Sequence, residues 1–283
     1  MGTTPFDGSR WWGMARGPLS KMAFGVIALL VLMALLAPWL SPFDPNAMNL
    51  DAVLAPPSWQ HWAGTDELGR DVATRIMYGA QPSLAAGLGI VAIGLGLGLL
   101  IGTFSGLMAG WVDALIMRLT DVAMALPGMV IALALTAALG PSLLNAVIAL
   151  GLLSVPAYIR VARGQALALR EREFVLAARA MGASNWHLIR AHLLPGVLPP
   201  VLVFTTFHLG AAILASSALS FIGLGAQPPM AEWGSMIGMG REYVLGHWWM
   251  VVIPGVVIML TAASFNLLGD ALRDALDPRV RKA

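Results

Sequence analysis

EREFVLAARAMGASNWHLIRAHLLP, which occupies residues 171–195, is a charged stretch between two long apolar segments. Apolar side chains within its first half recur at the spacing of one helical face, at Phe174, Ala177, Ala178 and Met181. This spacing predicts a short amphipathic helix. Because the stretch is polar and its neighbours are not, we expect it to lie in water.

Three residues shape the second half of this stretch. Gly182 interrupts the helix where a residue that tolerates positive φ is useful. Ser184 is a good N-cap for a second short helix, and Pro195 is expected to end that helix. We therefore predict a helix–glycine–helix elbow that projects from the membrane toward a soluble partner.

Composition places the elbow in a membrane protein. The 283 residues are 58% apolar and 11% charged, which is too apolar for a soluble domain. Four segments contain no Asp, Glu, Lys or Arg, and each is long enough to cross a hydrocarbon core of about 30 Å. The segment 122–159 is long enough to cross twice; the other three are 82–111, 193–231 and 243–269. With an apolar run at 22–40, they predict an all-α polytopic membrane protein with six transmembrane helices.

The pattern also predicts the order and orientation of the segments. Residues 1–21 form an inner N-terminus, and 22–40 an uncleaved first helix rather than a signal peptide, because the run is long and Pro38 follows Ala37. Residues 41–82 lie outside, 83–270 hold five helices and the 171–195 elbow, and 271–283 form an inner tail. Of the 17 basic residues, only Arg70, Arg75 and Arg241 fall in outer segments. This bias predicts that both termini are cytoplasmic.

Within the elbow, Ala177-Ala178, Gly182 and Leu194-Pro195 resemble the EAA loop of ABC-importer membrane subunits, although Leu176 stands where the family has Glu. In that family the loop inserts into a groove of the ATP-binding subunit. The resemblance implies that the following residues couple this chain to an ATPase: Glu173, Ala177, Ala178, Arg179, Gly182, Ala183, Ser184, Leu194 and Pro195.

The outer segments carry further motifs. One, GTDELGRD, resembles the GTDxxGRD signature of the dipeptide, oligopeptide and nickel branch of these permeases, and the tail from Gly269 resembles its closing GDxLRDxLDP. Acidic and basic residues three to five apart could fold the first motif on itself; a solvated loop with capping carboxylates is the alternative. A second outer segment, 218–249, is too rich in Gly and Pro for a straight span and could dip back toward the pore. Within it, Glu232-Trp233-Gly234 resemble the outer segment of the same permease branch. The outer-segment motif residues are therefore Gly64, Thr65, Asp66, Gly69, Arg70, Asp71, Glu232, Trp233 and Gly234.

The resemblance implies a type I ABC-importer transmembrane domain, the "C"-type permease subunit, in a bacterial inner membrane. Its expected partners are a homologous second permease subunit, two ATP-binding subunits, an extracytoplasmic substrate-binding protein and the lipid bilayer. The expected substrate is a di- or oligopeptide; nickel chelates, glutathione and other small molecules are the alternatives. An ATP-independent secondary transporter or channel is a remote alternative, because the predicted spans lack the charged residues that bind a coupling ion.

Enzymatic and cofactor chemistry have no candidate residues. No GxxxxGK[ST] loop occurs, and the only lysines are Lys21 and Lys282, so ATP and Mg are expected on partner subunits and no cofactor on this chain. The chain has no cysteine, and His208 has no second ligand at helical spacing, so no metal site is expected. Basic residues are dispersed rather than clustered with aromatic ones, which does not favour nucleic acid.

Several side chains within or beside the spans invite specific predictions. Glycines every four residues predict a helix-packing face rather than a nucleotide loop: Gly94, Gly98, Gly102, Gly106 and Gly110. A polar thread either lines the pathway or bonds its own helix or a neighbouring one: Thr205, Thr206, His208, Ser216 and Ser217.

The connections between spans carry further predictions. In an inner connection, Arg118 is expected to pair with Asp121. Pro127 is expected to kink the third helix. Trp248 and Trp249 are expected in an interfacial belt.

Overall fold

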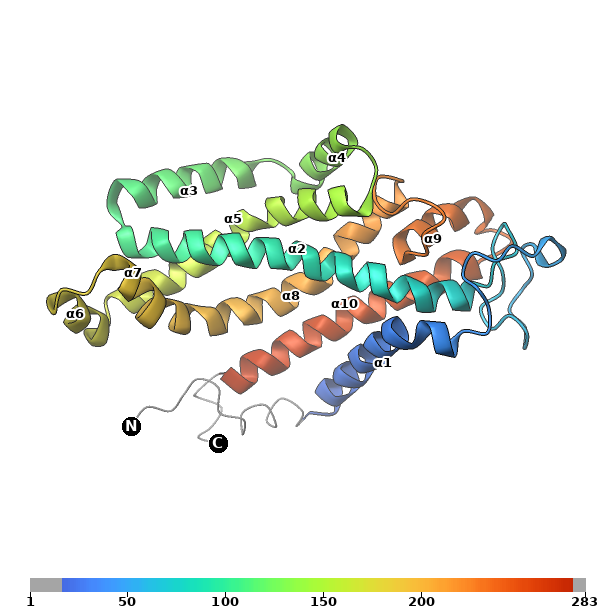
Figure 1. Ribbon diagram of the computed structural model, residues 1–283, viewed down its shortest axis with the longest axis horizontal. Helices are drawn as coiled ribbons and strands as arrows, with labels where there is room; N and C mark the ends of the chain where they lie inside the picture. Colours follow the sequence, from blue (N-terminus) through green and yellow to red (C-terminus); the bar gives the residue numbers. More distant parts are fainter. Residues whose placement is uncertain (1–16, 277–283) are drawn as a thin grey trace.

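The computed structural model describes residues 17–276, which form a bundle of long helices running roughly along one axis (Figure 1). Five helical stretches are long and apolar enough to cross a membrane. They are α1 (Pro18–Leu40), α2 (Val72–Met108), α5 (Leu143–Arg170), the stretch Asn185–Phe221 that ends in α8 (Leu194–Phe221), and α10 (Trp249–Leu276). The all-α polytopic fold is thus confirmed.

A sixth crossing depends on a broken helix. α3 (Gly110–Ala125) and α4 (Gly128–Leu139) pass the same length and composition test only as a pair, and they are bent by 85° at the break. Pro127 lies at that break as the N-cap residue of α4, as a proline that cannot continue the preceding helix should. The predicted kink of the third helix is therefore confirmed, and it is sharp.

The centre of the bundle is the pair α2 and α5, which approach closely because glycines face the contact. A Cβ added to Gly102 would come within 2.8 Å of the Ala162 Cβ, and one added to Gly106 within 2.7 Å of the Ala166 Cβ. Gly94 and Gly98 lie against Tyr158. Such small residues let helix backbones approach in a membrane. Gly110 does not join them: it begins α3 with φ +63° and has open space around it.

Three helices are longer than the sequence predicts. α2 already begins at Val72 and contains Pro82, so its first part lies within the predicted outer segment 41–82. α5 continues past Ile159 to Arg170. α10 continues through the Gly269 motif to Leu276. These helices continue beyond their apolar segments into charged residues, because charge alone does not break a helix.

The predicted Arg118–Asp121 pair is wrong. Asp121 instead pairs with Arg160 of α5, with Nη2 and Oδ1 2.7 Å apart. Asp113 of α3 accepts two hydrogen bonds from the Arg163 guanidinium of α5, at 2.5 and 2.6 Å, and one from the Ser105 hydroxyl of α2. These contacts hold α3 against α5, whereas an i, i+3 pair would have held α3 only to itself.

Candidate functional sites at the two ends

The elbow, residues 171–195, stands at one end of the bundle, opposite the segment 41–71 (Figure 1). Its first arm is α6 (Glu173–Ala180), and Gly182 follows with φ +86°. Its second arm starts with α7 (Asn185–His187), where the His187 N–H donates to the Ser184 Oγ at 3.3 Å. The helix–glycine–helix arrangement and the Ser184 cap are as predicted.

The two arms are held together by a small apolar cluster, and its composition corrects the predicted helical face. Val175 and Ala178 of α6 are buried against the second arm and α2; the other buried members are Leu107, Leu188, Ile189 and Leu193. Ala177 is exposed, Phe174 is 50% exposed and Met181 is 83% exposed. Of the predicted face, only Ala178 is buried, because the second arm covers the adjacent side of α6.

Pro195 does not end the second arm. A π-helical segment, Leu188–Leu193 (η3), joins α7 directly to α8, and Pro195 lies in the first turn of α8. There its missing N–H costs little, and π-helical turns are a known way to accommodate an irregularity within a helix. The second arm of the elbow and the span that follows are one continuous helix, Asn185–Phe221.

The remaining coupling candidates are spread over the elbow surface. Glu173, Arg179, Ser184 and Pro195 are exposed, and Ala183 and Leu194 are half-buried beside the cluster. Leu176, at the position where the family has Glu, is 45% exposed on α6. The elbow therefore presents apolar and charged side chains together on one small projection.

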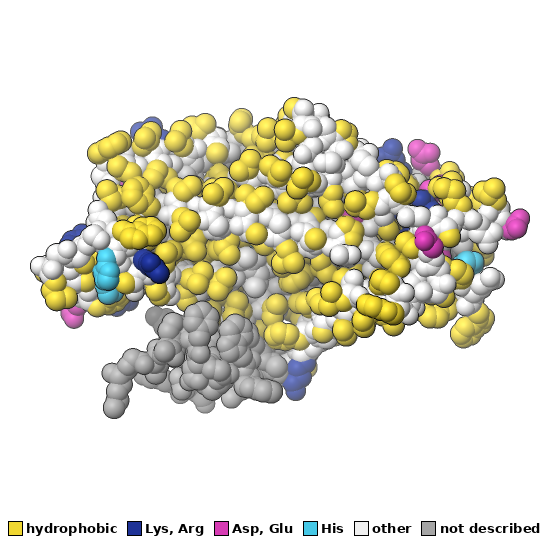
Figure 2. All heavy atoms as spheres, viewed as in Figure 1, with side chains coloured by type: hydrophobic (Ala, Val, Ile, Leu, Met, Phe, Trp, Pro, Cys, Tyr) yellow, Lys and Arg dark blue, Asp and Glu magenta, His cyan; other side chains and the backbone are white. Residues whose placement is uncertain are grey.

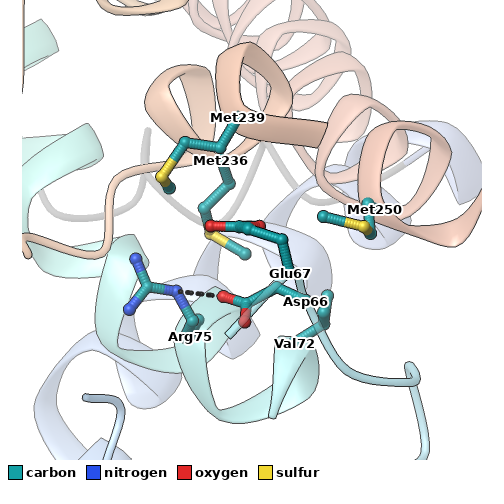
Figure 3. Close-up of a pocket in the computed structure, with 7 residues that line it drawn as sticks. All are labelled: Asp66, Glu67, Val72, Arg75, Met236, Met239 and Met250. Carbon is teal, nitrogen blue, oxygen red and sulfur yellow. Dashed lines mark ion pairs between the residues drawn. The ribbon is translucent and has the colours of Figure 1, made fainter. Parts of the chain in front are cut away.

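At the opposite end, residues 41–71 and α9 (Trp233–Gly240) form a layer packed on the first turns of α2 and α10. We call it the outer layer, after the predicted orientation. Its centre is a charge cluster (Figure 3). The Arg70 Nε lies 2.7 Å from Asp66 Oδ2, its Nη2 lies 3.0 Å from Glu67 Oε1, and the Arg75 Nε lies 3.7 Å from Asp66 Oδ2. The predicted folding through local ion pairs is confirmed. Asp66, Arg70 and Arg75 are buried, so the motif is not a solvated loop. Its carboxylates do act as caps, as the alternative predicted: Asp66 Oδ1 accepts the Leu68 and Arg70 N–H groups at 3.0 and 2.9 Å.

Close approach explains the glycines of this motif. Gly64 and Gly69 have φ of +71° and +72°. A Cβ on Gly69 would overlap the Asn49 carbonyl, and one on Gly64 would lie 2.8 Å from the Ala55 carbonyl oxygen. Asp71 then caps α2 by accepting the Thr74 N–H at 2.7 Å.

Two buried indoles tie the layer to its neighbours. The Trp249 Nε1–H donates to the Thr65 carbonyl at 3.1 Å, and the Trp233 Nε1–H donates to the Ile76 carbonyl at 3.0 Å. Trp249 is only 5% exposed, so its predicted place in an interfacial belt is wrong, whereas Trp248 is 53% exposed. An indole buried among other elements needs a partner for its N–H, and the Thr65 carbonyl provides it.

Glu232 anchors the start of α9. Its carboxylate accepts the N–H groups of Gly234 and Ser235 at 3.0 and 2.8 Å, and the Ser83 hydroxyl of α2 at 3.3 Å. Burial raises the pKa of the Glu232 carboxyl, and the backbone N–H donors oppose that rise. Gly234 lies so close to the Ser217 backbone of α8 that a Cβ there would overlap it. α9 is thus a short helix packed into the bundle.

Two of the five side chains in the polar thread of α8 bond their own helix, and a third contacts the neighbouring α5. The Thr205 hydroxyl donates to the Val201 carbonyl at 2.8 Å and the Thr206 hydroxyl to the Val203 carbonyl at 2.7 Å. The His208 Nδ1 lies 3.3 Å from the Tyr158 hydroxyl of α5. Ser216 and Ser217 are buried. Between residues 17 and 276, no three His, Asp or Glu side chains are arranged to hold a metal.

Sequence reasoning missed the contacts between distant segments. Tyr158, Arg163 and Trp249 all have partners 50 or more positions away. The available signal was weak: a charged or hydrogen-bonding group at the edge of an apolar segment needs a partner, but the pattern does not say which one.

Comparison with known proteins identifies the family. The profile of the binding-protein-dependent transport system inner membrane component matches residues 76–282, and that of the N-terminal TM domain of oligopeptide transport permease C matches residues 9–57. The chain is 49% identical to the probable D,D-dipeptide transport system permease protein DdpC of Escherichia coli, over 98% of this chain and 93% of that protein.

Two further relatives and one solved structure agree. The di/tripeptide transport system permease protein DppC of Pseudomonas aeruginosa is 42% identical, over 95% of this chain and 90% of its own length. The glutathione transport system permease protein GsiD of Escherichia coli is 42% identical, with 96% and 90% covered. A chain of the inward-facing MetNI methionine ABC transporter shares the fold, with a TM-score of 0.56 at 19% identity over 72% of this chain and 96% of that one. The predicted importer fold is confirmed, and this chain belongs to the family of binding-protein-dependent transport system inner membrane components.

Proposed function

We propose that this chain is the permease subunit of an ATP-driven importer of di- or oligopeptides and that its elbow docks into a separate ATP-binding subunit. One observation supports the coupling role: exposed apolar side chains lie next to a buried cluster that joins both arms of the elbow to α2. Phe174, Met181 and Trp186 are 50%, 83% and 65% exposed, while Val175 and Leu188 beneath them are fully buried.

This arrangement suits a mechanical contact with a soluble partner. Large exposed apolar side chains in a water-facing segment are typical of interaction sites. The buried cluster keeps their positions fixed, so a force on the elbow reaches α2 and α8 rather than being absorbed by a flexible loop. Exposed Arg172, Glu173 and Arg179 add charges that can orient the partner.

The remaining partners follow from the family. The proposed assembly contains a homologous second permease subunit, two ATP-binding subunits that hold ATP and Mg, and an extracytoplasmic binding protein that delivers substrate to the outer layer. The proposed orientation places both termini in the cytoplasm with the elbow. In support, α1 begins and α10 ends toward the end of the bundle that carries α6 (Figure 1).

Peptide is the proposed substrate because two relatives are named for dipeptides or tripeptides and a third for glutathione, itself a peptide derivative. The alternatives are glutathione and other small molecules such as nickel chelates. A competition assay with the assembled transporter and its binding protein in proteoliposomes distinguishes these substrates. An unlabelled dipeptide should reduce uptake of a labelled tripeptide more strongly than glutathione or a nickel chelate does.

The coupling role is tested with the double variant Phe174→Ala/Met181→Ala. Both side chains are exposed, so the variant should insert and fold, yet ATP-driven uptake should fall by about tenfold if each truncation costs about 0.7 kcal/mol of docking energy. Leu245→Ala is the matched control, since Leu245 is 102% exposed in the second outer segment. Unchanged uptake and unchanged co-purification of the ATPase in the double variant would refute docking through this face.

A further inference from the structure

A cavity opens in the outer layer, and none of the residues that line it belongs to the charge cluster. It has a volume of about 250 Å³ and is walled by three aromatic side chains, Phe43, Trp59 and Trp62. The Asp71 carboxylate and the Gln60 amide contribute the polar part of the wall, and Ala73 and Met77 of α2 close it. Small-molecule sites usually measure about 300–1,000 Å³, so this cavity suits a small group rather than a whole ligand.

The chemistry of the wall is that of a site for a cation. Aromatic faces attract an ammonium group, and aromatic cages are the usual receptors for such groups. A carboxylate and an amide oxygen can accept the N–H donors of a primary ammonium. Asp71 Oδ2 lies 2.9 Å from His61 Nδ1, and Oδ1 accepts the Thr74 N–H at 2.7 Å, so neither partner is a permanently charged guanidinium. Phe43 in turn stacks on His61 at 5.2 Å.

The surroundings have the matching charge. In residues 41–75 the acidic side chains outnumber the basic ones, which are Arg70 and Arg75; the acidic ones are Asp44, Asp51, Asp66, Glu67 and Asp71. Both arginines are turned to the charge cluster on Asp66 and Glu67. Figure 2 shows acidic side chains gathered at this end of the molecule. A cation is therefore favoured over an anion.

The position of the cavity indicates where the cation comes from. Two wall residues, Pro42 and Phe43, directly follow the end of α1, and two, Ala73 and Met77, lie in the first turns of α2; the others belong to the connecting segment 59–71. Both helices are long and apolar enough to cross a membrane. That level is where lipid headgroups lie and where tryptophans concentrate. Trp59 and Trp62 are 98% and 68% exposed, and Trp39 at the end of α1 is 79% exposed. We propose that this aromatic cavity binds the ammonium headgroup of a zwitterionic membrane lipid.

The test measures which lipids the protein retains. The full-length chain, purified in its native assembly, is equilibrated with mixed vesicles of phosphatidylethanolamine and phosphatidylglycerol, and bound lipids are counted by native mass spectrometry. Phosphatidylethanolamine should be retained preferentially. Loss of one cation–π contact in Trp62→Ala should reduce that preference by about fivefold. Trp59→Ala provides a second variant, and because both side chains are exposed, neither should unfold the protein.

Trp39→Ala is the matched control, because it removes an exposed indole from the same membrane level but not from the cavity wall. It should leave the lipid preference unchanged. The proposal is overturned if the native protein retains both lipids equally, or if Trp39→Ala and Trp62→Ala reduce the preference alike. It is also overturned if an added tripeptide displaces the lipid, since the cavity would then take the ammonium end of a substrate.

Discussion

The two ends of this molecule are built on opposite plans. The outer layer joins distant segments through buried polar contacts: Arg70 with Asp66, and the indoles of Trp233 and Trp249 with backbone carbonyls of Ile76 and Thr65. The elbow has no such network among its described residues, and its arms meet through a small apolar cluster around Val175 and Leu188.

The difference shows what each end requires. Buried charges and indoles are costly when they lack partners, so the directional contacts that they make favour one arrangement of the outer layer. An apolar cluster is less directional, and it holds the elbow while leaving its surface free for contacts. Large effects on stability are therefore expected at the outer layer, and large effects on transport with little loss of stability at the elbow.

Trp233→Ala should produce the largest loss of stability. The indole is fully buried, and truncation of such a side chain costs about 3–5 kcal/mol through lost burial and the cavity left behind. Trp186→Ala in the elbow removes an indole that is 65% exposed and should change stability little. Circular dichroism in detergent measures the thermal unfolding of both variants. Equal melting temperatures would contradict the expectation that stability depends more on the outer layer than on the elbow.

Gly182→Leu should disturb the elbow without unfolding the bundle. A residue with a Cβ pays about 1–2 kcal/mol at the positive φ of Gly182, although a Cβ there meets no atom within 4 Å. Uptake by the reconstituted transporter should be lost while membrane insertion is kept. Gly182→Asn is the control, because Asn tolerates this conformation; normal uptake by the leucine variant would remove the coupling role of the elbow.

Trp249→Phe should have a smaller effect on the outer layer. The ring remains, but the Thr65 carbonyl loses the N–H donor that lies 3.1 Å away, at a cost of about 1 kcal/mol. The same exchange at Trp248, which is 53% exposed, should be nearly silent. Chemical denaturation of the two variants compares them directly, and an equal loss in both would show that the buried hydrogen bond contributes nothing.

The smallest expected effect is a dependence of the folding stability on pH. Burial raises the pKa of Glu232 above its ordinary value of 4.5. Between that value and the folded-state pKa, the folded protein holds a proton that the unfolded chain has released, so stability falls as pH rises. Glu232→Gln cannot titrate, and its melting temperature should depend less on pH from 4.5 upward. An identical pH profile in both proteins would show that Glu232 does not titrate in this range.

The sequence was sufficient for the class of fold and for the elbow. Charge-free segments predict spans because hydrocarbon excludes charge, and Gly182 predicts a break because few residues tolerate its φ. The sequence was insufficient for predicting which side chains are buried wherever a distant segment covers them. A tryptophan at a membrane interface and one buried beneath an outer segment look the same, and Trp249 meets Thr65 across 184 positions.

Two local errors have the same origin. The apolar residues of α6 define two adjacent helical faces, one through Phe174 and Met181 and one through Val175 and Ala178. The second arm decides which is buried. The partners of Asp113 and Asp121 are likewise on α5, which the spacing along α3 cannot reveal.

The continuity of the second arm with α8 makes the elbow one end of a lever. The helix Asn185–Phe221 has 37 residues, and at a rise of about 1.5 Å per residue it is about 55 Å long. A tilt of about 5° about one end would carry the other end through about 5 Å. That far end includes Ser217, which lies directly against Gly234 of α9. If the elbow docks to an ATP-binding subunit as proposed, a small displacement of the elbow would reach the opposite end of this helix without passing through any loop.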